Sequence, residues 1–463
     1  MQDERTSAAP ALRGSSTLRD VRASIDRVDR ELVQLLAERR GYALEAARLK
    51  SPEALKDPAR EAQVLSNVTS LARERGLEPA LVEALYRDLM SGFVRDELAA
   101  KGAGAPAVGT GNVTALDAMP APEELKQRVP LTARAAATVV EGRGAVEAVL
   151  DGRDPRLLVV VGPCSVHDPA AALEYARRLR ALAEEVSDAL LLVMRVYLEK
   201  PRTSAGWEGF TNDPRLDGSL RVAEGMERGR RLLVEVNELG VPVGTEALDP
   251  LAPQYQGDLV SWYAIGARTA ESQTHRDLAS GLATAIGVKN ATDGRLETAV
   301  NAIVAASRPH AFVGIDERGR SAVIRTRGNR YGHLVLRGGA GRPNFDSVSV
   351  SLAEQELARA GLAPRIVVDC SHANSWKDPA RQPAVLRDAI AQIRNGNRSI
   401  AGVMIESFLE PGCQPLAADV STLRYGCSIT DGCLGWETTA EALREARAAL
   451  AGVIAERRSR PRP

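Results

Sequence analysis

The feature that most constrains this chain is an alternation of short apolar runs with helix-length segments after residue 156. The eight runs hold four to seven residues each and are 157–161, 190–196, 242–246, 262–266, 285–289, 334–337, 365–369 and 400–405. Short apolar runs of this kind are typical of strands that a parallel sheet buries on both faces. Their alternation with helices predicts a (β/α)8 barrel of the α/β class. The stretch 311–326 predicts an extra hairpin before the sixth strand.

The N-terminal part of the chain has a helical period instead. Apolar residues recur at spacings of three and four at Leu18, Val21, Ile25, Val28, Leu32 and Leu35. Such a seam is typical of a long helix that packs against other helices. Asp57-Pro58 and Pro79 mark the beginnings of two more helices. The pattern predicts an all-α three-helix domain that a second copy of the chain completes, so we expect a homo-oligomer, either a dimer through this domain or a tetramer.

Composition separates the two regions. Residues 99–122 are rich in Ala, Gly, Pro and Thr and carry almost no charge before Asp117, which is typical of a linker. We therefore expect a helical domain at 17–98, a linker at 99–122 and the barrel at 123–463.

Charge and cysteine content limit the classes of function. Sixty basic residues balance sixty acidic ones, which argues against nucleic acid or a membrane surface as a partner. No apolar stretch approaches the roughly 20 residues that cross a bilayer. The five cysteines are few and odd in number, so they do not indicate a disulfide framework. We expect a cytoplasmic protein.

The ends of the predicted strands carry two kinds of polar side chain, and the first kind could bind a metal. Because the carboxyl ends of barrel strands meet at one mouth, these side chains form a single set. The candidate ligands are Cys164, His372, Glu406 and Asp431. A thiol, an imidazole and two carboxylates suit Mn²⁺, Fe²⁺, Co²⁺ or Zn²⁺ better than Mg²⁺ or Ca²⁺. Cys164 alone could instead be a nucleophile or a small core residue.

The second kind of side chain is cationic. These residues are Arg195, Lys200, Arg202, Arg268, Lys289 and Arg337. Any one of them could be a solvated surface residue. Clustered at strand ends in a chain of zero net charge, they predict substrates with several negative charges, such as phosphates and a carboxylate. Glu246 follows the third strand and could order a water or a cation among them. The set predicts metal activation of an electrophile beside an anionic partner.

Several motifs around these positions resemble type I 3-deoxy-D-arabino-heptulosonate 7-phosphate (DAHP) synthases. The motifs are Gly162–Pro169, Arg195–Thr203, Gly266–Gln273, Leu336–Gly339, Asp369–Asn374 and Ser428–Trp436. The resemblance runs from about residue 117 to the C-terminus. It implies condensation of phosphoenolpyruvate with erythrose 4-phosphate, the entry step of the shikimate pathway. It also implies that the four candidate ligands named above hold the metal.

The same resemblance implies roles for the remaining residues at the mouth. Phosphoenolpyruvate would contact Arg195, Lys200, Arg268, Lys289 and Arg337, with Glu246 nearby. Erythrose 4-phosphate would contact the loop Lys200-Pro201-Arg202-Thr203. Lys200 would also protonate the alkoxide that forms when the two substrates join.

The helical region resembles the all-α chorismate mutases over roughly residues 17–98, on motifs at 35–40 and 57–61. Arg39 takes the next place on the apolar seam, and Lys50 lies about 20° from it around the helix. Two cations that face a bundle interior favour a dianionic ligand over simple packing. The resemblance implies that chorismate is held at its carboxylates by Arg22, Arg39 and Arg60, at its ether oxygen by Lys50, and at its hydroxyl region by Asp57 and Glu61.

Conversion of chorismate to prephenate by this region would make the protein bifunctional. Two alternatives remain from the sequence. The helical domain could bind chorismate or prephenate without turnover and regulate the barrel, or it could serve only for dimerisation. One departure from the family pattern bears on turnover, because this chain has Glu97 where many members carry a catalytic glutamine.

We predict that chorismate consumption rises toward acid pH, because Glu97 can donate a hydrogen bond to the ether oxygen only when it is protonated. Glu97→Gln should make the rate less dependent on pH. Prephenate formation measured across the pH range checks both statements. A wild-type rate that is flat with pH and full at neutrality would contradict them.

Overall fold

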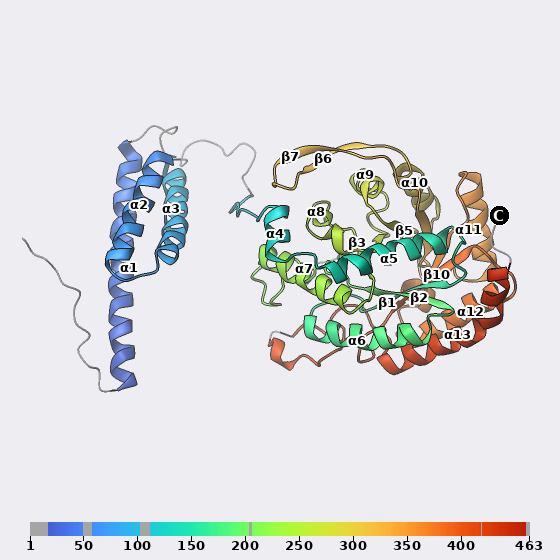
Figure 1. The fold of residues 1–463 in the computed structure, drawn as a ribbon. Coiled ribbons are helices and arrows are strands. Elements are labelled where there is room, and N and C mark those ends of the chain that lie inside the picture. Colours follow the sequence, from blue (N-terminus) through green and yellow to red (C-terminus); the bar gives the residue numbers. More distant parts are fainter. Residues whose placement is uncertain (1–16, 50–57, 102–111, 203–205, 418, 460–463) are drawn as a thin grey trace, which may run out of the picture. The chain divides into compact units, whose positions relative to one another are not determined.

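The structure is a computed structural model that describes residues 17–49, 58–101, 112–202, 206–417 and 419–459. The chain divides into two compact units, Met1–Asp117 and Ala118–Pro463 (Figure 1). Within the described ranges, none of the helices has the length and hydropathy needed to cross a membrane.

The first unit contains three helices: α1 (Leu18–Leu49), α2 (Pro58–Glu74) and α3 (Pro79–Lys101). Gly76 takes a left-handed conformation with φ +70° between α2 and α3, where a helix commonly ends on glycine. Helix α3 packs against both α1 and α2. The apolar seam of α1 remains largely exposed in the single chain, with Leu18 66% and Leu35 60% exposed. This unit therefore presents an apolar face that its own three helices do not cover.

Eight strands of the second unit close into one parallel barrel in the order β1-β10-β9-β8-β5-β4-β3-β2. The strands are β1 (Leu157–Gly162), β2 (Leu190–Arg195), β3 (Val243–Glu246), β4 (Trp262–Ile265), β5 (Ala285–Lys289), β8 (Gly332–Leu336), β9 (Ile366–Asp369) and β10 (Ile400–Glu406). Six of them are buried along their whole length, because helices cover the outside and packed side chains fill the inside. The predicted (β/α)8 barrel is confirmed.

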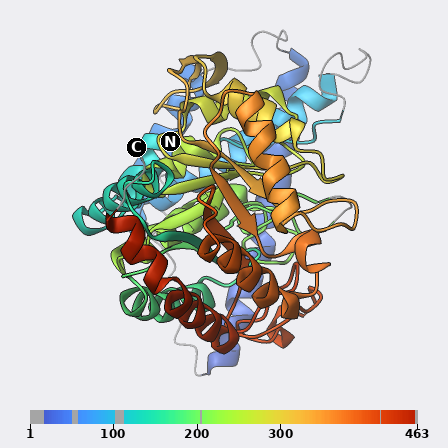
Figure 2. The same ribbon diagram turned by 90° about the vertical axis from the view of Figure 1, so that its right-hand side faces the viewer.

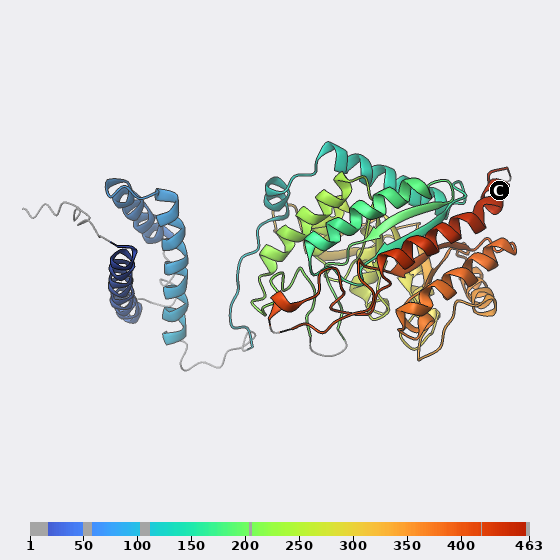
Figure 3. The same cartoon turned by 90° about the horizontal axis from the view of Figure 1, so that it is seen from below.

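Helices surround the barrel (Figures 1 and 2). They are α4 (Pro122–Arg128), α5 (Ala133–Leu150), α6 (Pro169–Glu185), α7 (Val222–Glu238), α8 (Ala252–Gln256), α9 (Gln273–Gly281), α10 (Glu297–Ala306), α11 (Ser347–Arg359), α12 (Gln382–Arg394) and α13 (Trp436–Ser459). Side-chain oxygens of Asp168 and Asp346 cap α6 and α11 by accepting backbone N–H groups. The last helix, α13, runs beside α6 (Figure 3) and is tied to its C-terminal end by an Arg444–Glu185 ion pair of 2.7 Å.

A two-stranded hairpin, β6 (Ala311–Ile315) and β7 (Ser321–Arg325), stands outside the barrel. It is inserted in the sequence between β5 and β8, which pair directly with each other. The connecting turn contacts the start of the unit. The backbone oxygen of Glu317 accepts a hydrogen bond from Glu123 N at 2.9 Å, and its carboxylate pairs with Lys126 at 2.8 Å.

Arg230 of α7 ties several outer elements together from a fully buried position. Its guanidinium forms two bonds to the carboxylate of Asp258, at 2.6 and 2.8 Å, and donates to the carbonyl oxygens of Val129 and Tyr255 at 2.8 Å each. Four bonds satisfy the buried charge, so loss of the cation would leave Asp258 and two carbonyls without this partner.

We predict that Arg230→Ala lowers the free energy of unfolding of the barrel by about 3–5 kcal/mol. The neighbouring exposed Arg231, which pairs with Glu227, provides a matched control. Arg231→Ala should change the free energy of unfolding by less than about 0.5 kcal/mol. Urea unfolding followed by tryptophan fluorescence measures both, because all four tryptophans lie in the barrel unit. Equal midpoints for the two variants would contradict the prediction.

Candidate metal and substrate site

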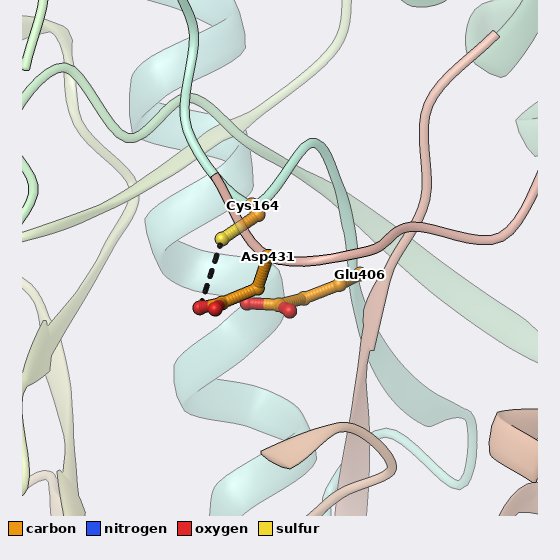
Figure 4. A group of neighbouring side chains, drawn as sticks. All are labelled: Cys164, Glu406 and Asp431. Atoms are coloured by element: carbon orange, nitrogen blue, oxygen red, sulfur yellow. Dashed lines mark hydrogen bonds between the residues drawn. The ribbon is translucent and has the colours of Figure 1, made fainter. Parts of the chain in front are cut away.

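Three of the predicted metal ligands converge at one end of the barrel. Cys164 follows β1, Glu406 ends β10, and Asp431 lies in the loop that precedes α13. One ligand atom from each of these side chains lies within 4.8 Å of the others, and Figure 4 shows the three pointing toward one another. Cys164 Sγ lies 3.6 Å from Asp431 Oδ2. The thiol and Glu406 are buried, whereas the Asp431 side chain is 49% exposed, which leaves one side of the cluster open.

The fourth predicted ligand, His372, begins a short 3-10 helix (His372–Ser375) after β9. It has φ +57°, a backbone conformation that is uncommon for a residue with a side chain. Its Nδ1 lies 3.0 Å from Asp369 Oδ2 and 2.6 Å from Ser371 Oγ. Its Nε2 lies 3.9 Å from Glu406 Oε1. The ring is therefore held through one nitrogen, and the other faces the cluster.

This set of side chains fits a divalent metal. A thiol, an imidazole held through its second nitrogen and two carboxylates is a donor set found for transition metals. Burial and the nearby carboxylate of Glu406 raise the pKa of the Cys164 thiol to about 11, against the opposing effect of Lys200. A divalent cation would favour the thiolate, because a coordinated thiol loses its proton.

Lys200 reaches into the same cluster. Its Nζ lies 2.8 Å from Cys164 Sγ and 2.9 Å from Asp431 Oδ2. Burial lowers its pKa, but the surrounding thiol and carboxylates outweigh burial and raise it above the usual range. Lys200 is therefore charged, and a strongly basic group such as a developing alkoxide could take its proton. With Pro201 and the exposed Arg202 it lines a cavity of about 540 Å³, and Thr203 lies outside the described residues.

Two of the predicted substrate cations are buried in ion pairs. Arg195, at the end of β2, is 1% exposed and lies 3.2 Å from Glu406 Oε1. Lys289, at the end of β5, lies 2.9 Å from Asp369 Oδ2. Burial opposes ionisation of Asp369, but Lys289, His372 and Arg195 together hold its pKa well below the usual range. Both cations thus favour the ionised form of Asp369.

The remaining predicted contacts at the mouth are Arg337, Arg268 and Glu246. Arg337 is half-buried, and burial together with the nearby Arg268 lowers its pKa. In the part of the chain that the structure describes, no carboxylate forms an ion pair with Arg337. Glu246 has a buried Oε1 without a hydrogen-bond partner among the described atoms. A Cβ at residue 266 would lie 2.2 Å from that oxygen, so Gly266 is needed beside it.

The structure describes only some of the residues predicted to contact chorismate in the helical unit. Arg39 is half-buried, with its guanidinium 5.7 Å from the ring centroid of Tyr86 and 5.2 Å from that of Phe93. The side chains of Arg22, Arg60 and Glu61 are exposed. The predicted roles of Lys50 and Asp57 fall on residues outside the described ranges, and the side chain of Glu97 is likewise not among those described.

Sequence reasoning missed three residues that hold the site. Asp369 and Ser371 orient His372, and Asn374 donates to the carbonyl oxygens of Leu336 and Asp369 at 3.0 and 2.8 Å. All three lie in the 369–374 motif that carried the resemblance. The sequence does show three polar residues directly after a predicted buried strand. Which of them contact His372 depends on how the loop folds.

Comparison with known proteins agrees with this geometry. Residues 129–444 match the family described as "DAHP synthetase I family", which is more than half of the chain. The chain belongs to the DAHP synthetase I family. Residues 21–98 match "Chorismate mutase type II". Both resemblances that the sequence motifs indicated are thereby confirmed.

Curated members of the DAHP synthetase I family are close in sequence. "Phospho-2-dehydro-3-deoxyheptonate aldolase, Tyr-sensitive" of Salmonella typhimurium is 55% identical over 73% of this chain and 94% of its own length. The Phe-sensitive protein of that name from Escherichia coli is 48% identical over 73% of this chain and 95% of its own length. A solved phospho-2-dehydro-3-deoxyheptonate aldolase from Francisella tularensis aligns with a TM-score of 0.72 and 43% identity, covering 73% of this chain and 99% of that one.

We predict that Asp369→Asn weakens Mn²⁺ binding about 10- to 100-fold, because an amide orients the imidazole of His372 less firmly than a carboxylate does. Asp188→Asn is the control, since Asp188 is an exposed acid that pairs with Arg447 far along the sequence. Competition for Mn²⁺ with a fluorescent chelator measures both affinities. Unchanged affinity in Asp369→Asn would show that His372 needs no such support.

Proposed function

We propose that the barrel condenses phosphoenolpyruvate with erythrose 4-phosphate to give DAHP and phosphate, the first step of the shikimate pathway, in the cytoplasm. The observation that carries this proposal is the convergence of Cys164, Glu406 and Asp431 with the ammonium group of Lys200 at one end of the barrel. The names of the curated relatives support the same reaction.

A divalent metal, either Mn²⁺, Fe²⁺, Co²⁺ or Zn²⁺, would be held by Cys164, His372, Glu406 and Asp431. When bound, such an ion supplies a Lewis acid that polarises an aldehyde oxygen. All four ions accept thiolate, imidazole and carboxylate ligands.

The chain's own residues would bind and orient two anions around this centre. Arg337 and Arg268 would hold the carboxylate or phosphate of phosphoenolpyruvate, with Arg195 and Lys289 supplying positive potential from their buried pairs. The loop of Lys200, Pro201, Arg202 and Thr203 would hold erythrose 4-phosphate through its phosphate. The arrangement restrains both reactants near one another, which is itself a large part of catalysis.

The bond changes of this reaction give Lys200 and Glu246 different roles. C3 of phosphoenolpyruvate bonds to the aldehyde carbon, and Lys200 protonates the oxygen that was the aldehyde. Water bonds to C2, and one of its protons replaces the proton that Lys200 gave up. The bond between C2 and the phosphate oxygen then breaks, and the second proton of that water leaves with the phosphate. Glu246, whose buried Oε1 has no hydrogen-bond partner among the described atoms, would orient that water.

For the helical unit we propose conversion of chorismate to prephenate. Its support is Arg39, a half-buried cation that contacts two aromatic rings and that no carboxylate pairs with among the described residues. A dianionic ligand would complete such a site. The exposed seam of α1 supports a homodimer through this unit, in which the partner would bring Arg22 to the site, and a tetramer is the next larger assembly. The alternatives are a unit that senses chorismate or prephenate and a unit that only dimerises.

We predict that Cys164→Ala abolishes condensation through loss of the metal, while chorismate consumption is unchanged because it takes place in the other unit. Cys413→Ala, which alters an exposed cysteine, should keep both activities. Loss of phosphoenolpyruvate with added Mn²⁺, before and after chelation, and loss of chorismate are measured on the same preparation.

Each outcome separates the proposals. Condensation that a chelator does not affect would overturn the metal dependence. Absence of chorismate turnover, together with inhibition of the barrel by prephenate that deletion of residues 1–105 removes, would favour the sensing function over the mutase. Absence of any chorismate binding would leave dimerisation as the function of the helical unit.

A further inference from the structure

Glu199 is a buried carboxylate at the start of the loop that carries Lys200. Its side chain is one of the few acidic groups in the barrel that are almost fully buried, with the residue 8% exposed. Its Oε2 accepts a hydrogen bond from the backbone N–H of Asp249 at 3.1 Å, and the Leu248 amide also bonds to the carboxylate. Leu248 and Asp249 belong to the loop after β3. Glu199 therefore joins the loop after β2 to the loop after β3.

The backbone around Glu199 is fixed by a short ladder. Glu199 pairs with Gly209 in an antiparallel bridge, and Lys200 N donates to the oxygen of Glu208 at 2.8 Å. A side chain at residue 209 could not fit, because its Cβ would lie 2.5 Å from Leu198 O and 2.6 Å from Glu199 Cα, and Gly209 has φ +123°. The backbone of residues 199 and 200 is therefore held in place, so that a bond to the side chain of Glu199 also restrains Lys200.

Adjacent residues in an extended bridge send their side chains to opposite sides. Glu199 is anchored to the loop after β3 on one side, while Lys200 reaches Cys164 Sγ and Asp431 Oδ2 on the other. We propose that Glu199 is a positioning residue that holds the ammonium group of Lys200 at the reacting oxygen. This inference deepens the proposed condensation and rests on it.

The hydrogen bonds that the Glu199 carboxylate accepts from the loop after β3 depend on pH, because nearby groups shift its pKa. Burial, with the carboxylates of Asp249 and Glu246 close by, raises the pKa of Glu199 to about 7, although the amides of Asp249 and Leu248 favour its ionised form. Because the pKa is raised, the carboxylate that accepts both amides is present above about pH 7 and is lost as the pH falls through that value. The other charged groups at this cavity are Lys200, Arg202 and Glu208. His275 contacts the same loop from α9, with Nε2 2.8 Å from Leu248 O.

The test compares Glu199→Gln and Glu199→Asp with Glu441→Gln, which makes the same chemical change at an exposed position of α13. We expect kcat of Glu199→Gln to fall about tenfold at pH 8, because a small displacement of a proton donor is costly. We also expect the decline of the wild-type rate below about pH 7 to disappear in this variant. Glu199→Asp keeps an ionisable group and should keep a decline at low pH with an intermediate rate. Glu441→Gln should match the wild type.

Three results would overturn the inference. The first is a Glu199→Gln enzyme with wild-type kcat. The second is a Glu199→Gln enzyme that keeps the decline below pH 7, which would assign the decline to a group other than Glu199. The third is a loss of activity that only follows a loss of folded protein in thermal unfolding, since that would make Glu199 a structural residue. A wild-type enzyme that does not condense the two substrates would instead overturn the proposed function, so the two failures are distinguishable.

Discussion

The hydrogen-bonded register between β1 and β10 is the constraint on which the site depends. Gly162 pairs with Glu406 where the last strand closes the barrel onto the first. Cys164 stands two residues beyond Gly162, so closure brings a thiol beside a carboxylate from the far end of the sequence. Gly162 has φ +154°, and a Cβ there would lie 2.8 Å from Arg195 O. Slippage of β10 by one residue would turn Glu406 to the other face of the sheet and dismantle the cluster.

Three of the cations at the mouth are paired with acidic groups. Arg195 faces Glu406, Lys289 faces Asp369, and Lys200 faces both a thiol and a carboxylate. A buried pair gains little over apolar packing, but loss of one member leaves the other uncompensated. Since these pairs share neighbours, substitutions among them should not combine additively. The zero net charge of the chain therefore conceals a strongly polarised site.

The barrel could be predicted from the sequence because the length of an apolar run and the presence of a helix after it are local properties. The identity of the residues at the strand ends was equally local, which is why Cys164 and Glu406 could be named together. The partner of each charge was not predictable. The sequence predicts Arg195 as a substrate contact but gives no sign that it is 1% exposed and forms an ion pair with Glu406. The left-handed backbone of His372 and its support by Asp369 depend on how a loop folds over strands that are distant in sequence.

The hairpin of β6 and β7 lies outside the strand ladder, yet its turn is tied to the chain as it enters the second unit. Glu317 bonds to Glu123 N and to Lys126, and Tyr255 Oη donates to the oxygen of Pro120 at 3.0 Å. The chain is thus bonded to the β6–β7 hairpin and to α8 before it reaches β1. A pull on that chain would therefore act on these bonds before it reached β1.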